Sequence, residues 1–171
     1  MKYRLTYCPP NSEVLVDAIN GGSGAVENIN SLGLHIGDKL KLSNTTNCKG
    51  PVKVNRNGDD ISIGRELASK LLVESEEEFD ITLAQSKVGD EVEVLKMNSE
   101  GDIRFRLLDM GLVRGVKMKV IRFAPLGDPI EVELNGFNLS LRLEEAKSIL
   151  IRIVVFGGSG NGRKRRWWDK W

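Results

Sequence analysis

The sequence predicts a mainly β protein made of two tandem small SH3-like barrels, each with a short helix. Three observations predict this fold: an internal repeat at constant spacing, short segments in which polar and apolar residues alternate, and Asn-Gly pairs typical of tight hairpins. With 40% hydrophobic and 29% charged residues, the 171-residue chain has the composition expected of a soluble globular protein. It contains no apolar run near the roughly 20 residues that a membrane-spanning helix needs.

The repeat appears when the sequence is shifted by 78 positions against itself, which aligns residues 13–73 with residues 91–151 without a gap. The matched positions are apolar strand residues and turn residues, as expected when one fold is encoded twice. They include Val14 with Val92, Gly33 with Gly111, Pro51 with Pro129, Asn57-Gly58 with Asn135-Gly136, and Ala68 with Ala146. We therefore predict one barrel at 1–74, an acidic linker at 75–82, a second barrel at 83–156, and a tail at 157–171.

A short helix is expected between the first two strands of each copy. In the second copy Ile103, Leu107 and Met110 recur at helical spacing, and Gly111 follows as a helix C-cap. Alternating residues predict the flanking strands at 91–94 and 116–120. The first copy repeats the helical pattern with Ala25, Ile29, Leu32 and Gly33.

The later part of each copy predicts a hairpin followed by a closing strand. Segments 130–134 and 139–143 alternate and flank Asn135-Gly136, a pair that tolerates the positive φ angles of a tight turn. One helical turn is expected at 144–147 and the closing strand at 149–156. Strands this short bury their edges most economically by curling into a barrel.

Residue types that perform catalysis or hold metals are scarce in this chain. His35 is its single histidine, and no Gly-x-x-x-x-Gly-Lys-Ser/Thr phosphate loop occurs. Cys8 and Cys48 lie too far apart for a metal clip and are expected to be reduced, unreactive thiols. Asp109 and Asp128 lack a neighbouring histidine or thiolate, so a helix end and a turn are favoured over a ferrous site. We predict no catalytic residues, no metal site and no cofactor.

An ordered set of short motifs spans most of the second copy. They are Arg106-Leu107-Leu108-Asp109-Met110-Gly111-Leu112, Gly115, Ala124-Pro125-Leu126-Gly127-Asp128-Pro129-Ile130, Leu139-Ser140-Leu141-Arg142 and Glu145-Ala146. Together these motifs resemble the FeoA family, and the same domain resembles the C-terminal module of DtxR-type iron-dependent repressors. The first copy is degenerate: residues 29–33 keep the helical spacing and the glycine but lose the arginine and the aspartate. The sequence leaves open whether this copy is a structural partner or meets a different ligand.

The resemblance implies an SH3-like barrel that assists FeoB, a membrane ferrous-iron transporter with a cytosolic GTP-binding domain. FeoA-like proteins act there as adaptors or regulators and not as enzymes, so we expect a cytoplasmic protein with a FeoB-like partner. The alternative is an iron-linked regulatory or nucleic-acid-binding SH3-like module, since fold does not fix function. The lack of a helix-turn-helix segment disfavours that alternative, and the sequence does not define the oligomeric state.

The end of the predicted helix is the candidate partner-binding surface. It comprises Arg106, Leu108, Asp109, Met110 and Leu112, with the two charged residues as a polar rim and Met110 as an adaptable apolar contact. A second interpretation makes Leu107 and Met110 core residues and Gly111 a helix cap.

The tail is the part of the chain least similar to the family. A glycine-rich tether leads to a basic and tryptophan-rich end, made of Arg163, Lys164, Arg165, Arg166, Trp167, Trp168, Lys170 and Trp171. This composition favours contact with an anionic membrane surface, at the inner face of the membrane. Nucleic-acid binding through phosphate contacts and stacking is the rival interpretation, and a tail without a partner is the third.

Overall fold

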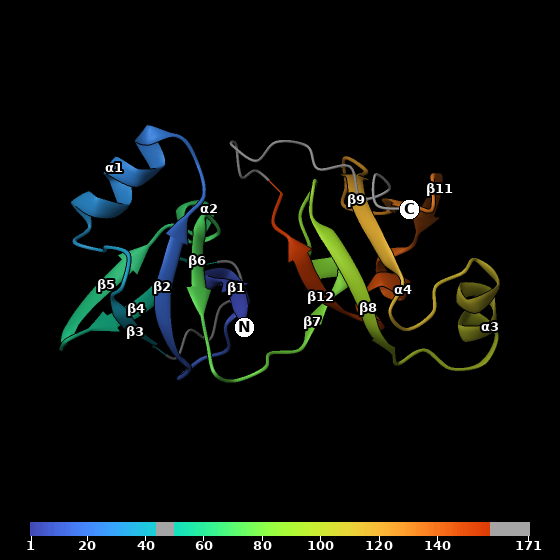
Figure 1. Cartoon of the computed structure of the whole chain (residues 1–171), viewed down its shortest axis with the longest axis horizontal. Helices are drawn as coiled ribbons and strands as arrows, with labels where there is room; N and C mark the ends of the chain where they lie inside the picture. The colour runs from blue at the N-terminus through green and yellow to red at the C-terminus, as the bar shows by residue number, and fades with distance from the viewer. Residues whose placement is uncertain (44–49, 158–171) are drawn as a thin grey trace, which may run out of the picture. The chain divides into compact units, whose positions relative to one another are not determined.

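The computed structural model describes residues 1–43 and 50–157. These residues form two compact units, Met1–Phe79 and Asp80–Gly157, which we call the first and the second module (Figure 1). Each module contains an antiparallel sheet of six short strands that curls into an SH3-like barrel. The predicted fold class, two tandem small barrels with short helices, is confirmed.

The first module begins with an edge strand and a 3-10 turn, and its last strand lies in the sheet next to that edge strand. Its elements are β1 Lys2–Arg4, the turn Leu5–Tyr7, β2 Glu13–Ile19, α1 Ser23–Ser31, β3 Lys39–Leu42, β4 Val52–Arg56, β5 Asp59–Ile63, α2 Arg65–Ala68 and β6 Leu71–Glu74. The strand order in the sheet is β1-β6-β2-β3-β4-β5.

The second module repeats this plan element by element. Its elements are β7 Ile81–Thr82, the turn Leu83–Gln85, β8 Glu91–Met97, α3 Gly101–Asp109, β9 Lys117–Phe123, β10 Ile130–Leu134, β11 Phe137–Leu141, α4 Leu143–Lys147 and β12 Ile149–Val155. The strand order β7-β12-β8-β9-β10-β11 is that of the first module. Most elements are displaced by the same 78 positions that align the sequence, so the internal repeat is a structural duplication.

Alternation along the strands builds the core of each barrel. In β8 the side chains of Val92 and Val94 are buried between exposed or half-buried neighbours, and Val14 and Val16 do the same in β2. The strand registers agree as well: Val14 pairs with Leu40 as Val92 pairs with Met118. Each fully buried aliphatic side chain contributes about 1.5–3 kcal/mol of transfer free energy.

The Asn-Gly pairs turn both predicted hairpins. Asn57 and Asn135 have φ angles of 52° and 50°, and the glycines that follow have φ angles of 100° and 85°. These left-handed conformations are the ones that a tight two-residue hairpin requires and that asparagine and glycine tolerate best. The turns therefore fix the β4–β5 and β10–β11 registers.

Several local features differ from the sequence-based expectations. β1, β7 and the two 3-10 turns were not predicted, because segments of two or three residues show no periodicity. Leu143 begins α4 instead of ending a strand, and Ile103 is 48% exposed although its spacing suggested a core position. The acidic segment is tied to the first module at Phe79, whose ring centroid lies 4.8 Å from that of Tyr3.

Candidate functional site

The end of α3 carries the residues predicted to form a partner-binding surface. Leu107 is fully buried and anchors the helix, while Gly111 ends it with a φ angle of 85°. Arg106 and Asp109 are exposed, and Leu108 and Met110 are half-buried. The prediction that Leu112 contacts a partner was wrong. Its side chain is fully buried in the core, so it supports the helix end and presents no contact surface.

A pocket of about 410 Å³ opens beside this helix within the second module. Its wall is formed by Arg106 from α3, Asp128 and Pro129 from the β9–β10 loop, Ser140 from β11, and Arg142, the residue before α4. The barrel brings these residues together from three segments of the chain, around positions 106, 128–129 and 140–142. Of the predicted surface residues, only Arg106 lines the pocket.

The carboxylate of Glu145 holds one side of this pocket in place. It is 5% exposed, and its Oε1 lies 2.5 Å from a terminal nitrogen of Arg106. Its Oε2 accepts a hydrogen bond of 2.8 Å from the backbone N–H of Arg142. Both oxygens are therefore satisfied, as a buried carboxylate requires, and the Arg106 guanidinium is fixed at the rim of the pocket.

The β9–β10 loop is fastened to the opposite side. The Asp128 carboxylate accepts a hydrogen bond of 3.1 Å from the backbone N–H of Leu143, at the start of α4. Within the loop, Ala124 N–H donates to the carbonyl of Pro129 at 2.9 Å, and Gly127 N–H donates to the carbonyl of Ala124 at 2.7 Å. Asp128 thus has a turn role that also places its carboxylate in the pocket wall.

Arg142 is a charged group of the pocket that was not predicted as a site residue from the sequence. It is exposed, and its guanidinium forms no ion pair with any residue in the part of the chain that the structure describes. Glu145 was also missed. The available signal was that both residues belong to the motifs of the second copy and have no counterpart in the first.

The first module builds the same backbone without these charges. The positions of Arg106, Asp128, Arg142 and Glu145 are held there by Asn28, Gly50, Gly64 and Leu67, whereas Pro51 and Ser62 are retained. The neighbouring Arg65 donates to the carbonyl of Gly50 at 3.4 Å. The barrel therefore folds without the charged residues of the pocket.

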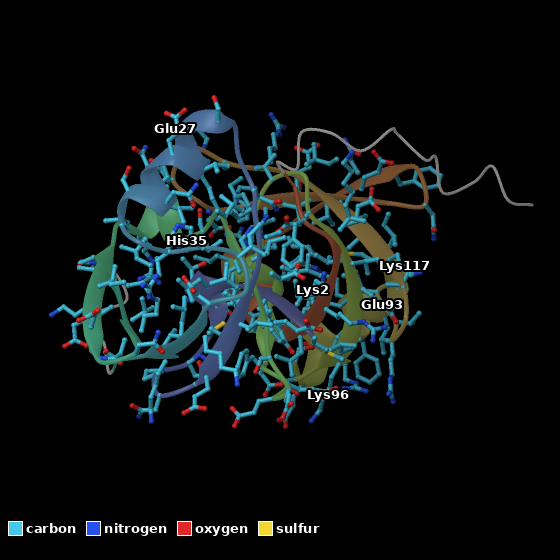
Figure 2. All side chains as sticks on the ribbon, turned by 60° about the vertical axis from the view of Figure 1, so that its left-hand side comes forward. Lys2, Glu27, His35, Glu93, Lys96 and Lys117 are labelled. Carbon is cyan, nitrogen blue, oxygen red and sulfur yellow. The ribbon has the colours of Figure 1, made fainter. Side chains whose placement is uncertain are left out.

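The second module also exposes large apolar side chains that the first replaces by acidic ones. Phe105 on α3 is 66% exposed and Phe137 on β11 is 74% exposed. Their counterparts are Glu27, which lies on the outer side of α1 (Figure 2), and Asp59. Leu126, at the tip of the β9–β10 loop, is 97% exposed. Exposed aromatic side chains near an arginine are typical of protein-binding surfaces.

The outer face of the second sheet carries paired charges. Glu93 on β8 pairs in register with Lys117 on β9, and Figure 2 shows these two side chains on adjacent strands. A terminal nitrogen of Arg152 donates to Glu93 at 2.8 Å, and this hydrogen bond lowers the pKa of the Glu93 carboxyl. Such solvated ion pairs contribute little to stability.

The remaining candidate chemistry is sparse. Cys8 is buried, and burial raises the pKa of its thiol to about 12, so the thiol stays protonated at neutral pH. Within residues 1–43 and 50–157, no group of three or more His, Cys, Asp or Glu side chains is placed to hold a metal ion. Over the same ranges, no helix has the length and apolar character needed to cross a membrane. Cys48 and the predicted membrane-contact residues of the tail lie outside the described residues.

Comparison with known proteins agrees with the duplication. Residues 3–75 and residues 81–153 each match the FeoA domain. An Fe(2+) transport protein A of Methanocaldococcus jannaschii is 41% identical over 75 residues, which cover 44% of this chain and 89% of that protein. A fusion of Fe(2+) transport protein A with the Fe(2+) transporter FeoB from Porphyromonas gingivalis is 33% identical over 72 residues, covering 42% of this chain and 8% of the fusion.

A solved structure resembles the chain over both modules. It is the iron(II) transport protein A from Clostridium thermocellum, with a TM-score of 0.56 and 18% sequence identity, covering 94% of this chain and 93% of that one. At this identity the likeness concerns the fold.

Proposed function

The chain belongs to the FeoA domain family, and on this premise we propose that it is a non-enzymatic accessory protein of ferrous-iron transport that contacts the cytosolic part of a FeoB-like transporter. The fusion protein of Porphyromonas gingivalis carries the main support, because there a segment similar to this chain is joined covalently to the transporter. A permanent link between two proteins raises their effective concentration and favours partners that otherwise associate.

The second module is the proposed contact. Its α3 and the C-cap residue Met110 present Arg106, Leu108, Asp109 and Met110 on or near the surface, next to the exposed ring of Phe105. Aromatic and arginine side chains dominate the binding energy of most protein interfaces. The first module, with Glu27 in place of Phe105, lacks this combination, so the contact is assigned to the second module.

The experiment measures binding of the full chain to the cytosolic domain of a FeoB-like transporter from the same genome by calorimetry. Phe105→Glu, which introduces the residue of the first module, should weaken binding about tenfold or more because an apolar anchor is replaced by a charge. Ile36→Glu is the matched control, since Ile36 is 65% exposed in the first module. Equal weakening by both variants, or no binding by the unaltered chain, would contradict the proposal.

The tail is proposed as a second, weaker contact with an anionic membrane surface. All three tryptophans of the protein lie at positions 167, 168 and 171, so intrinsic tryptophan fluorescence reports the tail alone. Vesicles that contain phosphatidylserine should shift the emission to the blue, and added salt should reverse the shift. Emission that stays unchanged with these vesicles rules this contact out.

A further inference from the structure

We propose that the pocket of the second module binds the carboxylate of an acidic peptide segment, with Arg142 as the principal donor and Arg106 as the second. This inference rests on the proposed function only for the identity of the protein that supplies the segment. It concerns the pocket lined by Arg106, Asp128, Pro129, Ser140 and Arg142.

Arg142 and Arg106 have guanidinium N–H donors that are available to bind a ligand in the pocket. The Arg142 guanidinium has no ion pair with a described residue, although its backbone N–H is engaged by Glu145. A guanidinium carries five N–H donors in a planar fork that matches a carboxylate with two parallel hydrogen bonds. Arg106 uses one terminal nitrogen on Glu145 and keeps further donors at the rim.

The Arg106–Glu145 pair is not needed to build the barrel. Burying a carboxylate costs several kcal/mol of desolvation, which its ion pair offsets only in part, and an apolar residue often does as well. The first module has no such pair, because Leu67 stands at the position of Glu145 and Asn28 at the position of Arg106. The pair instead fixes the Arg106 side chain, which would otherwise lose conformational entropy on binding a ligand.

The charges of the pocket favour a carboxylate over a phosphate. The two arginines are balanced by Glu145 and Asp128, so the site has no net positive charge to offer a dianion. The Asp128 carboxylate repels a second negative charge but can accept a hydrogen bond from a peptide N–H through the oxygen that Leu143 leaves unused. An acidic residue within a peptide supplies both groups, the carboxylate for the arginines and the N–H for Asp128.

The size of the pocket agrees with this ligand. A volume of about 410 Å³ lies near the lower end of the range for small-ligand sites, about 300–1,000 Å³. This space suits one acidic residue with its flanking peptide groups.

The test is an NMR titration of the full chain with three small probes. N-acetyl-glutamate N-methylamide should shift the backbone amides of residues 140–143 in a saturable manner, and N-acetyl-glutamine N-methylamide should bind at least about tenfold more weakly, since a charge-assisted hydrogen bond is lost. Inorganic phosphate should bind more weakly than the glutamate probe. Tighter binding of phosphate, or no saturable shift with glutamate, would overturn the proposal.

Two variants distinguish binding in the pocket from nonspecific attraction of the probe to positive charge. Arg142→Gly introduces the residue of the first module and should weaken binding of the glutamate probe about tenfold or more. Arg104→Asn removes a charge from α3 at a residue that does not line the pocket and should leave the affinity unchanged. Equal losses in the two variants would overturn the proposal. If the transporter domain binds the unaltered chain but the glutamate probe shows no binding that depends on Arg142, the pocket proposal fails and the proposed function stands. If the glutamate probe binds but the transporter domain does not, the reverse holds.

Discussion

The first and second modules share a backbone plan but differ in the side chains around the pocket and on the exposed surface. Both have the same strand order, the same hairpin turns and the same alternation of buried residues. The second adds two arginines, two carboxylates and exposed phenylalanines, where the first has Asn28, Gly50, Gly64, Leu67, Glu27 and Asp59. The difference teaches that the barrel fold does not depend on the charged and aromatic residues that distinguish the second module. One module therefore serves as an internal control for the other.

The largest expected effect concerns what the modules share. Leu107 and Ile29 occupy the same fully buried helix position. Replacing either by alanine should lower the free energy of unfolding of its own module by about 2–5 kcal/mol, because a cavity is left in a small core. Amide hydrogen exchange measures each module separately. A loss below about 1 kcal/mol in one module would show that this position contributes differently to the stability of the two barrels.

The Arg106–Glu145 ion pair should stabilise the second module, and the first module has no counterpart of it. Arg106→Asn leaves the Glu145 carboxylate with one hydrogen bond and should destabilise the second module by about 1–2 kcal/mol, less than for a fully buried pair because Arg106 is half exposed. Adding Glu145→Leu reproduces the residues of the first module and should recover most of this loss. Urea unfolding of the single and double variants measures both effects, and a double variant less stable than the single one would refute this reasoning.

The two Asn-Gly turns should contribute equally to the stability of the two modules, and by less than the buried helix residues do. Asn135→Ala and Asn57→Ala should each cost about 1 kcal/mol, because alanine pays the steric penalty of a left-handed conformation that asparagine partly avoids. Thermal unfolding of the two variants is the measurement. Clearly unequal losses would mean that one of these turns is held by its surroundings and not by its own residue.

The smallest effect is a pH dependence confined to the second module. The hydrogen bond from Arg152 lowers the pKa of Glu93 below its ordinary value of 4.5, so this stabilisation is present above pH 4.5 and is lost as the pH falls through the lowered pKa. Because the pair is solvated, the difference in stability between the unaltered chain and Glu93→Gln should shrink by only about 0.5 kcal/mol or less over that range. Leu15, the counterpart of Glu93, offers the control variant Leu15→Gln, for which no such change is expected.

Much of the scaffold was predictable because its signals are local. The Asn-Gly pairs, the glycines after α1 and α3, and the alternation in β2 and β8 report turn geometry and burial within a few residues. The edge strands β1 and β7 were not predictable, since their pairing partners β6 and β12 lie far along the chain. Leu112 was misplaced because the motif at 106–112 mixes core and surface residues, and only packing distinguishes them.

The sequence by itself determined that one barrel is built twice and where each copy turns, since periodic patterns and turn residues act over short distances. The tertiary structure alone decided that Arg106, Asp128, Ser140 and Arg142 share one pocket and that Glu145 contacts both of its arginines. These side chains come from separate segments, and no short-range pattern encodes their meeting. Strand pairing and the hydrogen-bonded path of the β9–β10 loop bring them together.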